Sequence, residues 1–333
     1  MGSLLSELQN KIGEEVRENV LLAPYTLYKI GGAAEYFLAA RNEDQIIKAV
    51  QTGQELELPL TFLGGGSNVL VNTAGVEGLV IRMRNGKLLF ANRTLEVGAG
   101  CSLGRLVNES VDRGLTGLEW AAGIPGTVGG AIYGNAGAYG REIADFLVSV
   151  KVYNGKEALV YPKEKLEFRY RDSCFKKEKK GEVILSAVLK LENNPDPQKS
   201  KREIKEHLQD REKKHPLEYP NAGCVFKNVK LKSGKAELLY PAQGFMKPEL
   251  RKNLPSQYIE RGVIPAFYLI ERADLKGYQI GGVRISTKHA NFLVKVGKAT
   301  SDHVLMLISY IKQQVRDRFG IQLKEELRLI GFD

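Results

Sequence analysis

Two glycine-rich segments give the clearest chemical signal in this sequence. The first, Gly64-Gly65-Gly66-Ser67-Asn68, follows the apolar run 58–63, and the second, residues 123–140, contains seven glycines among eighteen residues. Glycine reaches positive φ and lacks the Cβ that keeps main chain away from a ligand. Successive backbone N–H groups in such loops form anion-binding concavities. Two of these loops in one chain predict a cofactor of dinucleotide size.

The familiar nucleotide-binding fingerprints are absent from this chain. Residues 98–104 read GAGCSLG, whose last glycine is one position late for G-x-G-x-x-G. The Gly64 segment lacks the Lys-Ser/Thr ending of a P-loop. A Rossmann domain and a P-loop are therefore poor fits. The sequence predicts a cofactor-binding site of another type.

Three further segments carry side chains capable of chemistry: YRDS at 170–173, NAGC at 221–224 and EELRLIG at 325–331. Each also has a structural explanation. An Arg-Asp pair is usually a surface ion pair, a single cysteine is usually a small buried hydrophobe, and a glutamate in a terminal strand usually faces solvent. Sequence spacing alone does not bring these segments together.

Composition sets the outer bounds. A chain of 333 residues with 43% hydrophobic and 26% charged residues is typical of a soluble protein with two or three domains. The sequence has no basic segment followed by a long apolar one and no apolar run of about 20 residues, so we expect no signal peptide and a cytoplasmic protein without a membrane partner. Cys101, Cys174 and Cys224 are too few and too separated for a disulfide framework or a zinc site, and we expect no metal.

The formal net charge of +10 has two interpretations. It could serve nucleic-acid binding, or it could attract a small polyanion to a cleft. Much of the excess lies in 176–180 and 199–214, which we interpret as solvated surface. No aromatic-interleaved basic motif accompanies these residues, so we expect no nucleic-acid partner and an anionic small-molecule substrate.

Strands and helices alternate along the chain, which predicts an α+β architecture. The break at 193–197, rich in Asn and Pro, separates a cofactor-binding block from a smaller second block. The last helix should have Ser301 as its N-cap and Gly320 as its stop. We expect strands at 36–40, 58–63, 79–83, 87–92, 94–97, 147–153, 158–161, 165–168 and 183–191, and helices at 7–18, 43–53, 103–113 and 198–214.

Taken together, the motifs resemble one family, the UDP-N-acetylenolpyruvoylglucosamine reductases (UDP-N-acetylmuramate dehydrogenases), in its shorter type. The matching pieces span nearly the whole chain in the family's order. They are TLYKIGGAAEYF (26–37), LGGGSNVLV (63–71), the 123–140 segment, YRDSCFK, KHPLEYPNAGCVFKN (214–228), IGGVRISTKHANFLV (280–294) and FGIQLKEELRLIG (319–331).

The resemblance implies an FAD-binding fold of the vanillyl-alcohol-oxidase (PCMH) type in two subdomains, plus an α+β substrate-binding domain. The FAD block would be residues 1–193, its N-terminal part packing with the C-terminal segment, and the substrate-binding and catalytic part would be residues 198–333. FAD would be noncovalent, and NADPH would reduce it before the enolpyruvyl substrate binds. The cofactor residues implied are Gly64, Gly65, Gly66, Ser67, Asn68, Gly123, Pro125, Thr127, Gly129, Gly130, Asn135, Tyr139 and Arg328.

The resemblance also implies the catalytic groups. Arg171 would hold the substrate carboxylate, since a guanidinium binds a carboxylate in a bidentate way. Glu326 would stabilise the enol-like intermediate with Arg171. Cys224 would donate the proton, in place of the serine that is usual in this family. The substrate-binding residues implied are Tyr170, Lys214, Asn228 and His289.

The chain also departs from the family pattern in segment 229–263, which is longer than usual, and at Asp274, where glycine is usual. Two alternatives remain open at this point. The same flavin fold serves FAD-dependent alcohol oxidases and dehydrogenases, and a degenerate flavin-binding regulator would keep the glycine loops without the catalytic set. The resemblance to the reductase family predicts a monomeric bacterial enzyme of peptidoglycan precursor synthesis.

Overall fold

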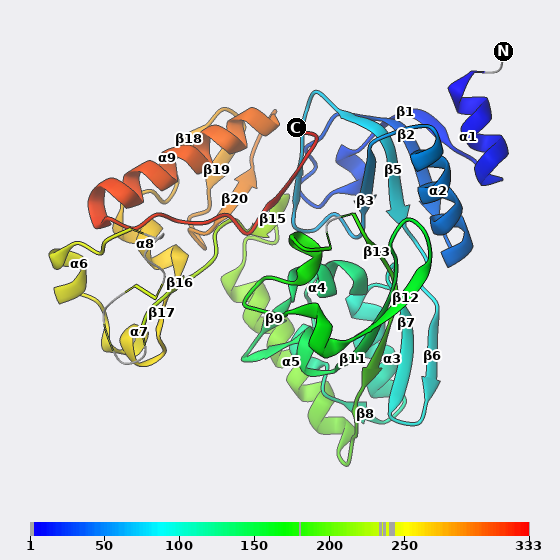
Figure 1. The fold of residues 1–333 in the computed structure, drawn as a ribbon. Helices are drawn as coiled ribbons and strands as arrows, with labels where there is room; N and C mark the ends of the chain where they lie inside the picture. The colour runs from blue at the N-terminus through cyan, green and yellow to red at the C-terminus, as the bar shows by residue number, and fades with distance from the viewer. Residues whose placement is uncertain (1–2, 180, 233–234, 236–237, 240–243, 333) are drawn as a thin grey trace. The chain divides into compact units, whose positions relative to one another are not determined.

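The computed structural model describes residues 3–179, 181–232, 235, 238–239 and 244–332, and these form two compact units (Figure 1). The first unit consists of Met1–Leu21, Ala33–Gly66 and Gly75–Lys213. The second unit consists of Leu22–Gly32, Ser67–Ala74 and Lys214–Asp333. The chain therefore enters the second unit twice before it stays there. Each unit has its own apolar core.

The first sheet of the first unit has the strand order β1-β2-β5-β3. Its strands are β1 (Arg17–Leu21), β2 (Ala33–Ala40), β3 (Leu60–Leu63) and β5 (Val76–Met83), with β5 parallel to both β2 and β3. Helices α1 (Leu4–Ile12) and α2 (Glu43–Glu55) pack together beside this sheet. Asn42 begins α2 by accepting a hydrogen bond from the Gln45 amide, and Ile46 and Val50 face the core.

The second sheet of this unit is antiparallel, in the order β12-β11-β13-β7-β6. Its strands are β6 (Leu88–Ala91), β7 (Thr94–Gly98), β11 (Leu147–Tyr153), β12 (Ala158–Pro162) and β13 (Val183–Lys190). Three helices accompany it: α3 (Leu103–Asp112), α4 (Val128–Gly134) and α5 (Pro197–Lys214). Alternate residues of β7 and β11, such as Val97 and Val150, are fully buried, as expected for strands with one core-facing side.

The second unit is built on a four-stranded antiparallel sheet in the order β15-β20-β19-β18. These strands are β15 (Asn221–Cys224), β18 (Gln279–Ile280), β19 (Val283–Ile285) and β20 (Phe292–Lys295). Helix α9 (Ser301–Phe319) contacts β18, β19 and α8 (Ala266–Arg272), and it buries Val304, Ile308 and Val315. A separate parallel pair joins β4 (Val69–Val71) to β21 (Arg328–Ile330).

The segment 229–263, which is longer than usual for the resembled family, is described in part. It contains β16 (Val229–Lys230), α6 (Pro248–Lys252), α7 (Ser256–Glu260) and the start of β17 (Val263–Ile264). The Phe245 amide donates to the Gly320 carbonyl at 3.0 Å, and a Cβ on Gly320 would meet the Phe245 oxygen at 1.9 Å. Glycine at 320 therefore permits a backbone crossing at the end of α9.

Several short elements complete the chain. They are β8 (Leu115–Thr116), β9 (Gly137–Ala138), β10 (Arg141–Glu142), β14 (Glu192–Asn193), and the 3-10 helices η1 (Ala23–Tyr25), η2 (Glu119–Ala121), η3 (Ile143–Asp145), η4 (Lys163–Leu166) and η5 (Cys174–Lys176). No helix among the described residues is long and apolar enough to cross a membrane.

The predicted α+β architecture is confirmed, but three local predictions are wrong. Residues 165–168 are not a strand, because η4 leads into Glu167, whose φ is 46°. The first helix stops at Ile12 because Gly13 adopts a left-handed conformation, and a strand follows. The residue that caps α9 is Thr300, which accepts a hydrogen bond from the His303 amide, whereas Ser301 is buried and bonded to Thr73.

Candidate functional site

The two glycine segments meet within the first unit. A Cβ on Gly64 would lie 2.5 Å from the Thr127 hydroxyl oxygen, and a Cβ on Gly65 would lie 2.7 Å from the Gly126 Cα. Real Cβ atoms essentially never approach so closely. The backbones of the two segments are therefore in direct contact, some 60 residues apart in sequence, and glycine is required for that approach.

A third glycine segment joins them. The Gly129 amide donates to the Ala99 carbonyl and the Val128 amide donates to the Cys101 carbonyl, each at 2.9 Å. A Cβ on Gly100 would lie 2.6 Å from the Asn85 nitrogen. The 98–104 segment therefore belongs to the same group of contacting loops.

These loops line an open cavity of about 480 Å³ in the first unit. Three of the predicted cofactor residues, Gly64, Gly65 and Thr127, line it. Sequence reasoning missed the other lining residues, which are Arg82, Met83, Arg84, Gly86, Gly100, Cys101, Ser102, Arg105 and Gly126. Arg82 lies at the end of β5 and Arg84 just after it, and this spacing of two cations at a strand end was the available signal.

Helix α4 connects the cavity to the next predicted residues. Thr127 begins α4 by accepting a hydrogen bond from the Gly130 amide, and Asn135 ends it with a φ of 44°. The Asn135 side chain is completely buried and donates to the Arg169 carbonyl at 3.0 Å. Its Oδ1 has no hydrogen-bond partner among the described residues. A buried acceptor left unpaired is costly, so this oxygen fits a donor group on a ligand.

Arg171 is tied to the end of the second glycine segment. Its guanidinium donates to the Gly137 carbonyl at 2.7 Å and to the Asn135 carbonyl at 3.4 Å. The residue is half-buried, adopts a φ of 54°, and lies 5.4 Å from the ring centroid of Tyr170. A non-glycine residue in the left-handed region is uncommon and tends to mark a functional position.

Tyr139 and Gly123 face helix α5. The Tyr139 ring stacks on His207 at 3.8 Å, and its hydroxyl donates to the Asp210 carboxylate at 3.0 Å. A Cβ on Gly123 would lie 2.9 Å from side-chain atoms of Leu208 and Arg211. The described contacts of these two predicted cofactor residues are therefore with α5, which closes one side of the glycine segment.

In the second unit, Cys224 and Glu326 lie on paired segments. The Glu326 amide donates to the carbonyl of Val225, the residue after Cys224, at 2.8 Å. Asn68 donates from its side chain to the Glu326 carbonyl at 3.2 Å, and the Arg328 amide returns a bond to the Asn68 carbonyl at 3.1 Å. Ser67 and Asn68 belong to this unit, whereas Gly64–Gly66 belong to the first.

The predicted substrate residues are dispersed. His289 packs against Phe292 at 4.9 Å and Phe267 at 5.1 Å, and burial lowers the pKa of its imidazole because it disfavours the charged form. Asn228 accepts a hydrogen bond from the Ala266 amide at the start of α8. Lys214 is exposed at the end of α5, and Tyr170 belongs to the first unit.

Comparison with known proteins adds the decisive observation. The FAD binding domain family matches residues 34–160, and the family of UDP-N-acetylenolpyruvoylglucosamine reductase C-terminal domains matches residues 215–330. The reductase of Solibacter usitatus is 34% identical over 310 residues, which covers 93% of this chain and 95% of the relative. That of Lachnoclostridium phytofermentans is 35% identical, covering 98% and 97%. The chain belongs to the UDP-N-acetylenolpyruvoylglucosamine reductase family.

A solved structure agrees with this membership. The UDP-N-acetylenolpyruvylglucosamine reductase of Thermus caldophilus has a TM-score of 0.72 and 31% identity, covering 95% of this chain and all of that one. Membership makes this chain an oxidoreductase that uses FAD with NADPH as hydride donor, and it confirms the predicted flavin fold with an added substrate-binding domain.

The first unit fits that cofactor. Backbone contact at the glycine segments leaves no room for a Cβ. The Asn135 Oδ1 is buried without a partner among the described residues. Three arginines, Arg82, Arg84 and Arg105, line one cavity. Amides and guanidinium groups suit the diphosphate of a dinucleotide.

Proposed function

We propose that Arg171, Cys224 and Glu326 perform the protein's part of the family reaction, the reduction of UDP-N-acetylglucosamine enolpyruvate to UDP-N-acetylmuramate for peptidoglycan precursor synthesis. FAD, when bound, carries hydride from NADPH to the methylene carbon of the enolpyruvyl group. The protein must then stabilise negative charge and supply a proton. The observation that supports this proposal is the bond from the Glu326 amide to the carbonyl of Val225, which pairs the segment of Glu326 with the residue that follows Cys224.

Arg171 would bind the enolpyruvyl carboxylate. Hydride addition places negative charge on the neighbouring carbon and on that carboxylate, so a guanidinium that already holds the carboxylate stabilises the transition state more than the ground state. Its two bonds to the carbonyls of Asn135 and Gly137 support this role, because they fix the guanidinium before substrate arrives.

Cys224 would deliver the proton to the ether carbon, which completes the saturated lactyl group. The free thiol is a far stronger acid than the serine hydroxyl usual in the family, with a reference pKa of about 8.5. Glu326, in its protonated form, would donate a hydrogen bond to the enol-like intermediate together with Arg171.

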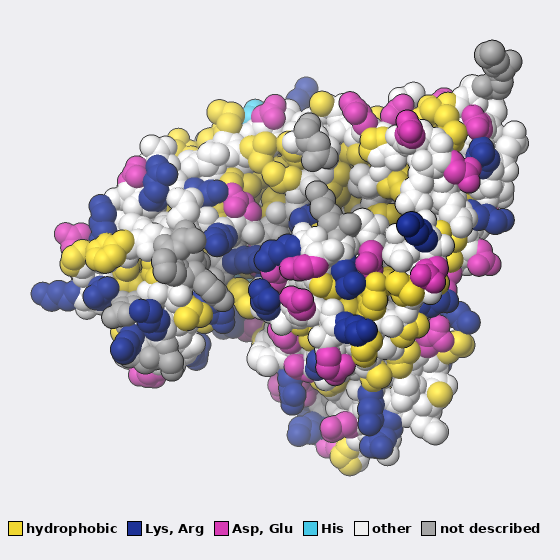
Figure 2. Space-filling model, in the orientation of Figure 1, with side chains coloured by type: hydrophobic (Ala, Val, Ile, Leu, Met, Phe, Trp, Pro, Cys, Tyr) yellow, Lys and Arg dark blue, Asp and Glu magenta, His cyan; other side chains and the backbone are white. Residues whose placement is uncertain are grey.

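The remaining assignments are also proposals. Residues 1–193 would hold FAD through Gly64–Asn68, Gly123, Pro125, Thr127, Gly129, Gly130, Asn135 and Tyr139, and Arg328 would contribute from the C-terminal segment. Residues 198–333 would hold the UDP-sugar through Lys214, Asn228 and His289, with Tyr170 contributing from the flavin block. We propose a monomer in the bacterial cytoplasm. Figure 2 shows Lys and Arg interleaved with Asp and Glu over the visible face, which favours a solvated surface over a nucleic-acid patch.

Separate measurement of the two half-reactions tests the catalytic roles. Arg171→Ala and Glu326→Ala should leave flavin reduction by NADPH within a few-fold of wild type. Flavin reoxidation by substrate should fall by about 10²–10³-fold, the usual effect of removing one transition-state donor. Stopped-flow absorbance of the flavin band under anaerobic conditions follows both steps.

Two neighbours provide matched controls. Glu325 precedes Glu326 and pairs with Lys312 at 2.6 Å, and Arg169 is exposed and pairs with Glu167 at 3.3 Å. Glu325→Ala and Arg169→Ala should leave both half-reactions unchanged. Equal losses in the two half-reactions of Arg171→Ala or Glu326→Ala would show that these residues support the flavin or the fold instead.

A further inference from the structure

One group of charges in the first-unit cavity has no part in the steps above. Arg82 and Arg84 reach the cavity from the end of β5, and Arg105 reaches it from the first turn of α3. The reacting flavin ring and the adenine are flat and largely uncharged. Arginines gathered on one cavity therefore point to the anionic part of the cofactor.

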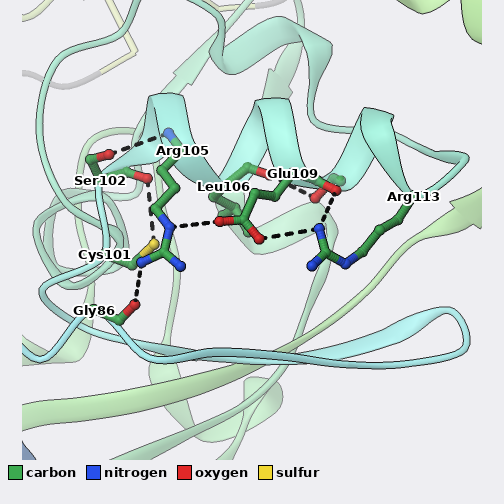
Figure 3. Close-up of polar contacts among 8 residues, drawn as sticks. Gly86, Cys101, Ser102, Arg105, Leu106, Glu109 and Arg113 are labelled. Carbon is green, nitrogen blue, oxygen red and sulfur yellow. Dashed lines mark hydrogen bonds and ion pairs between the residues drawn. The ribbon is translucent and has the colours of Figure 1, made fainter.

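Arg105 is held in place by two bonds (Figure 3). Its Nε donates to the Glu109 carboxylate at 2.7 Å, and one terminal nitrogen donates to the Gly86 carbonyl at 2.8 Å. The other oxygen of Glu109 pairs with Arg113 at 3.1 Å. One carboxylate thus serves two guanidinium groups, and the three side chains together keep one net positive charge.

The remaining donors of Arg105 are available to a ligand. A guanidinium carries five N–H groups, and two are used in the bonds above. The others have no partner among the described residues. The side chain is 51% exposed, and it lines the cavity beside Ser102 and Cys101. Because its position is already fixed, it loses little rotamer freedom on binding.

We propose that Arg105, positioned by Glu109 and Gly86, binds the diphosphate of FAD and makes this protein discriminate FAD from riboflavin. The inference rests on FAD being the cofactor of this family. An arginine binds a phosphate through parallel charge-assisted hydrogen bonds, and neither partner of Arg105 removes its charge. Arg82 and Arg84 add to the positive potential of the same cavity.

Flavin binding by the full-length protein, stripped of flavin, tests the proposal. Titration with FAD and with riboflavin, followed by flavin fluorescence, gives a dissociation constant for each. Arg105→Gln should weaken FAD binding by about tenfold or more, because a charge-assisted hydrogen bond is lost. Its riboflavin binding should change less than about twofold. Arg105→Lys should recover part of the FAD affinity, since it restores the charge without the planar fork.

Arg113→Gln is the matched control. Arg113 lies on the same helix and shares Glu109, but its guanidinium sits 4.2 Å from the Phe90 ring centroid and is not part of the cavity lining. Its FAD affinity should stay at the wild-type value. Glu109→Gln should weaken FAD binding, by less than Arg105→Gln, because Arg105 stays charged and loses its orientation.

Two results overturn the proposal. One is an Arg105→Gln variant that binds FAD as tightly as wild type. The other is an Arg105→Gln variant that loses affinity for FAD and for riboflavin equally. That result would mean that Arg105 contacts the flavin ring or only supports the packing of the site. A wild-type protein that binds no flavin would contradict the function itself, so the two failures are distinguishable.

Discussion

The three cysteines differ in exposure, and this difference isolates Cys224. Cys101 and Cys174 are each 2% exposed, whereas Cys224 is half-buried. Burial raises the pKa of Cys101, and it raises the pKa of Cys174 to about 11. Both buried cysteines are therefore protonated at neutral pH and hidden from reagents. A thiol-directed reagent at that pH should report on position 224.

Cys224 should be the site of alkylation, and substrate should protect it. Peptide mass spectrometry after iodoacetamide treatment, with and without substrate, measures both effects. Cys224→Ser should keep substantial turnover, because a hydroxyl is the usual donor in the family. Cys224→Ala should slow flavin reoxidation by about 10²-fold or more, the range for a lost general acid. Near wild-type turnover in Cys224→Ala would show that the proton comes from another group.

Sequence reasoning at the residue scale located the glycine loops and the resembled family's motifs, but it missed the arginines of the cavity. Glycine clusters are visible locally, since backbone approach demands them wherever they occur. Arg105 looks like any surface residue of a helix. Its role depends on the Gly86 carbonyl and on Glu109, and only the fold brings the first of these near.

At the scale of elements, a buried carboxylate connects α5 to the segment before the second glycine loop. Glu119 in η2 is 4% exposed and accepts hydrogen bonds from the Ser200 and Thr116 hydroxyls and from the Gly117 amide. Burial alone would raise the pKa of this carboxyl. The hydrogen bonds from Ser200 and Thr116 outweigh burial, so the pKa lies below its usual value of 4.5.

The lowered pKa determines how the contribution of Glu119 to the free energy of unfolding depends on pH. A carboxyl with a lowered folded-state pKa stabilises the fold at pH values above its unfolded pKa. That stabilisation is lost as pH falls through the folded pKa. Glu119→Gln should therefore reduce the free energy of unfolding at pH 7 by about 2 kcal/mol, the worth of hydrogen bonds to a charged group. The difference from wild type should shrink at and below about pH 4.

Urea unfolding at both pH values measures this effect. Glu192→Gln is the control, because Glu192 is exposed on β14 opposite Thr116 in the same sheet pair. It should change stability little at either pH. If Glu119→Gln lowers the free energy of unfolding by the same amount at pH 7 and in acid, the shape of the Glu119 side chain, and not its charge, stabilises the fold.

Elements with clear periodicity were predictable, and elements set by left-handed residues were not. The apolar spacing of α9 and the alternation in β7 and β11 follow directly from burial on one side. The stretch 165–168 has similar composition, yet Glu167 adopts a positive φ that no local pattern announces. Its conformation follows from tertiary context, which overrides propensity.

At the scale of the whole molecule, the second unit includes two segments that come much earlier in the sequence than the rest of it. Tyr28, Ile30 and Leu70 belong to its apolar core. Strand β4 pairs with β21, and the Asn72 amide donates to the Ile330 carbonyl at 2.9 Å. A unit that looks C-terminal in sequence therefore takes part of its core and one strand from residues 22–32 and 67–74.

Residues 214–333 expressed alone should consequently fail to fold cooperatively. The fragment lacks those core side chains and leaves β21 without its partner, and each large apolar side chain lost from a core costs about 2–5 kcal/mol. Circular dichroism against temperature should show no sharp transition, whereas the full chain should show one. A cooperative transition in the fragment would contradict this and make the second unit an autonomous domain.

This interleaving was not predictable from the sequence. The Asn-Pro break at 193–197 suggests one boundary, and composition gives no sign that residues 22–32 and 67–74 leave the first unit. Both segments are short, and each mixes polar with apolar residues as the neighbouring parts of the first unit do. Their assignment depends on long-range pairing, such as β4 with β21, that local patterns do not encode.

The pairing of β4 with β21 also has a consequence for synthesis. Translation produces β4 early, and its partner strand emerges some 259 residues later, the separation of the paired residues Val69 and Arg328. During that interval one edge of β4 lacks the strand that will cover it, and an open edge invites pairing with other chains. A nascent chain halted before Glu326 therefore exposes that edge and lacks the acid proposed to act on the enolpyruvyl group.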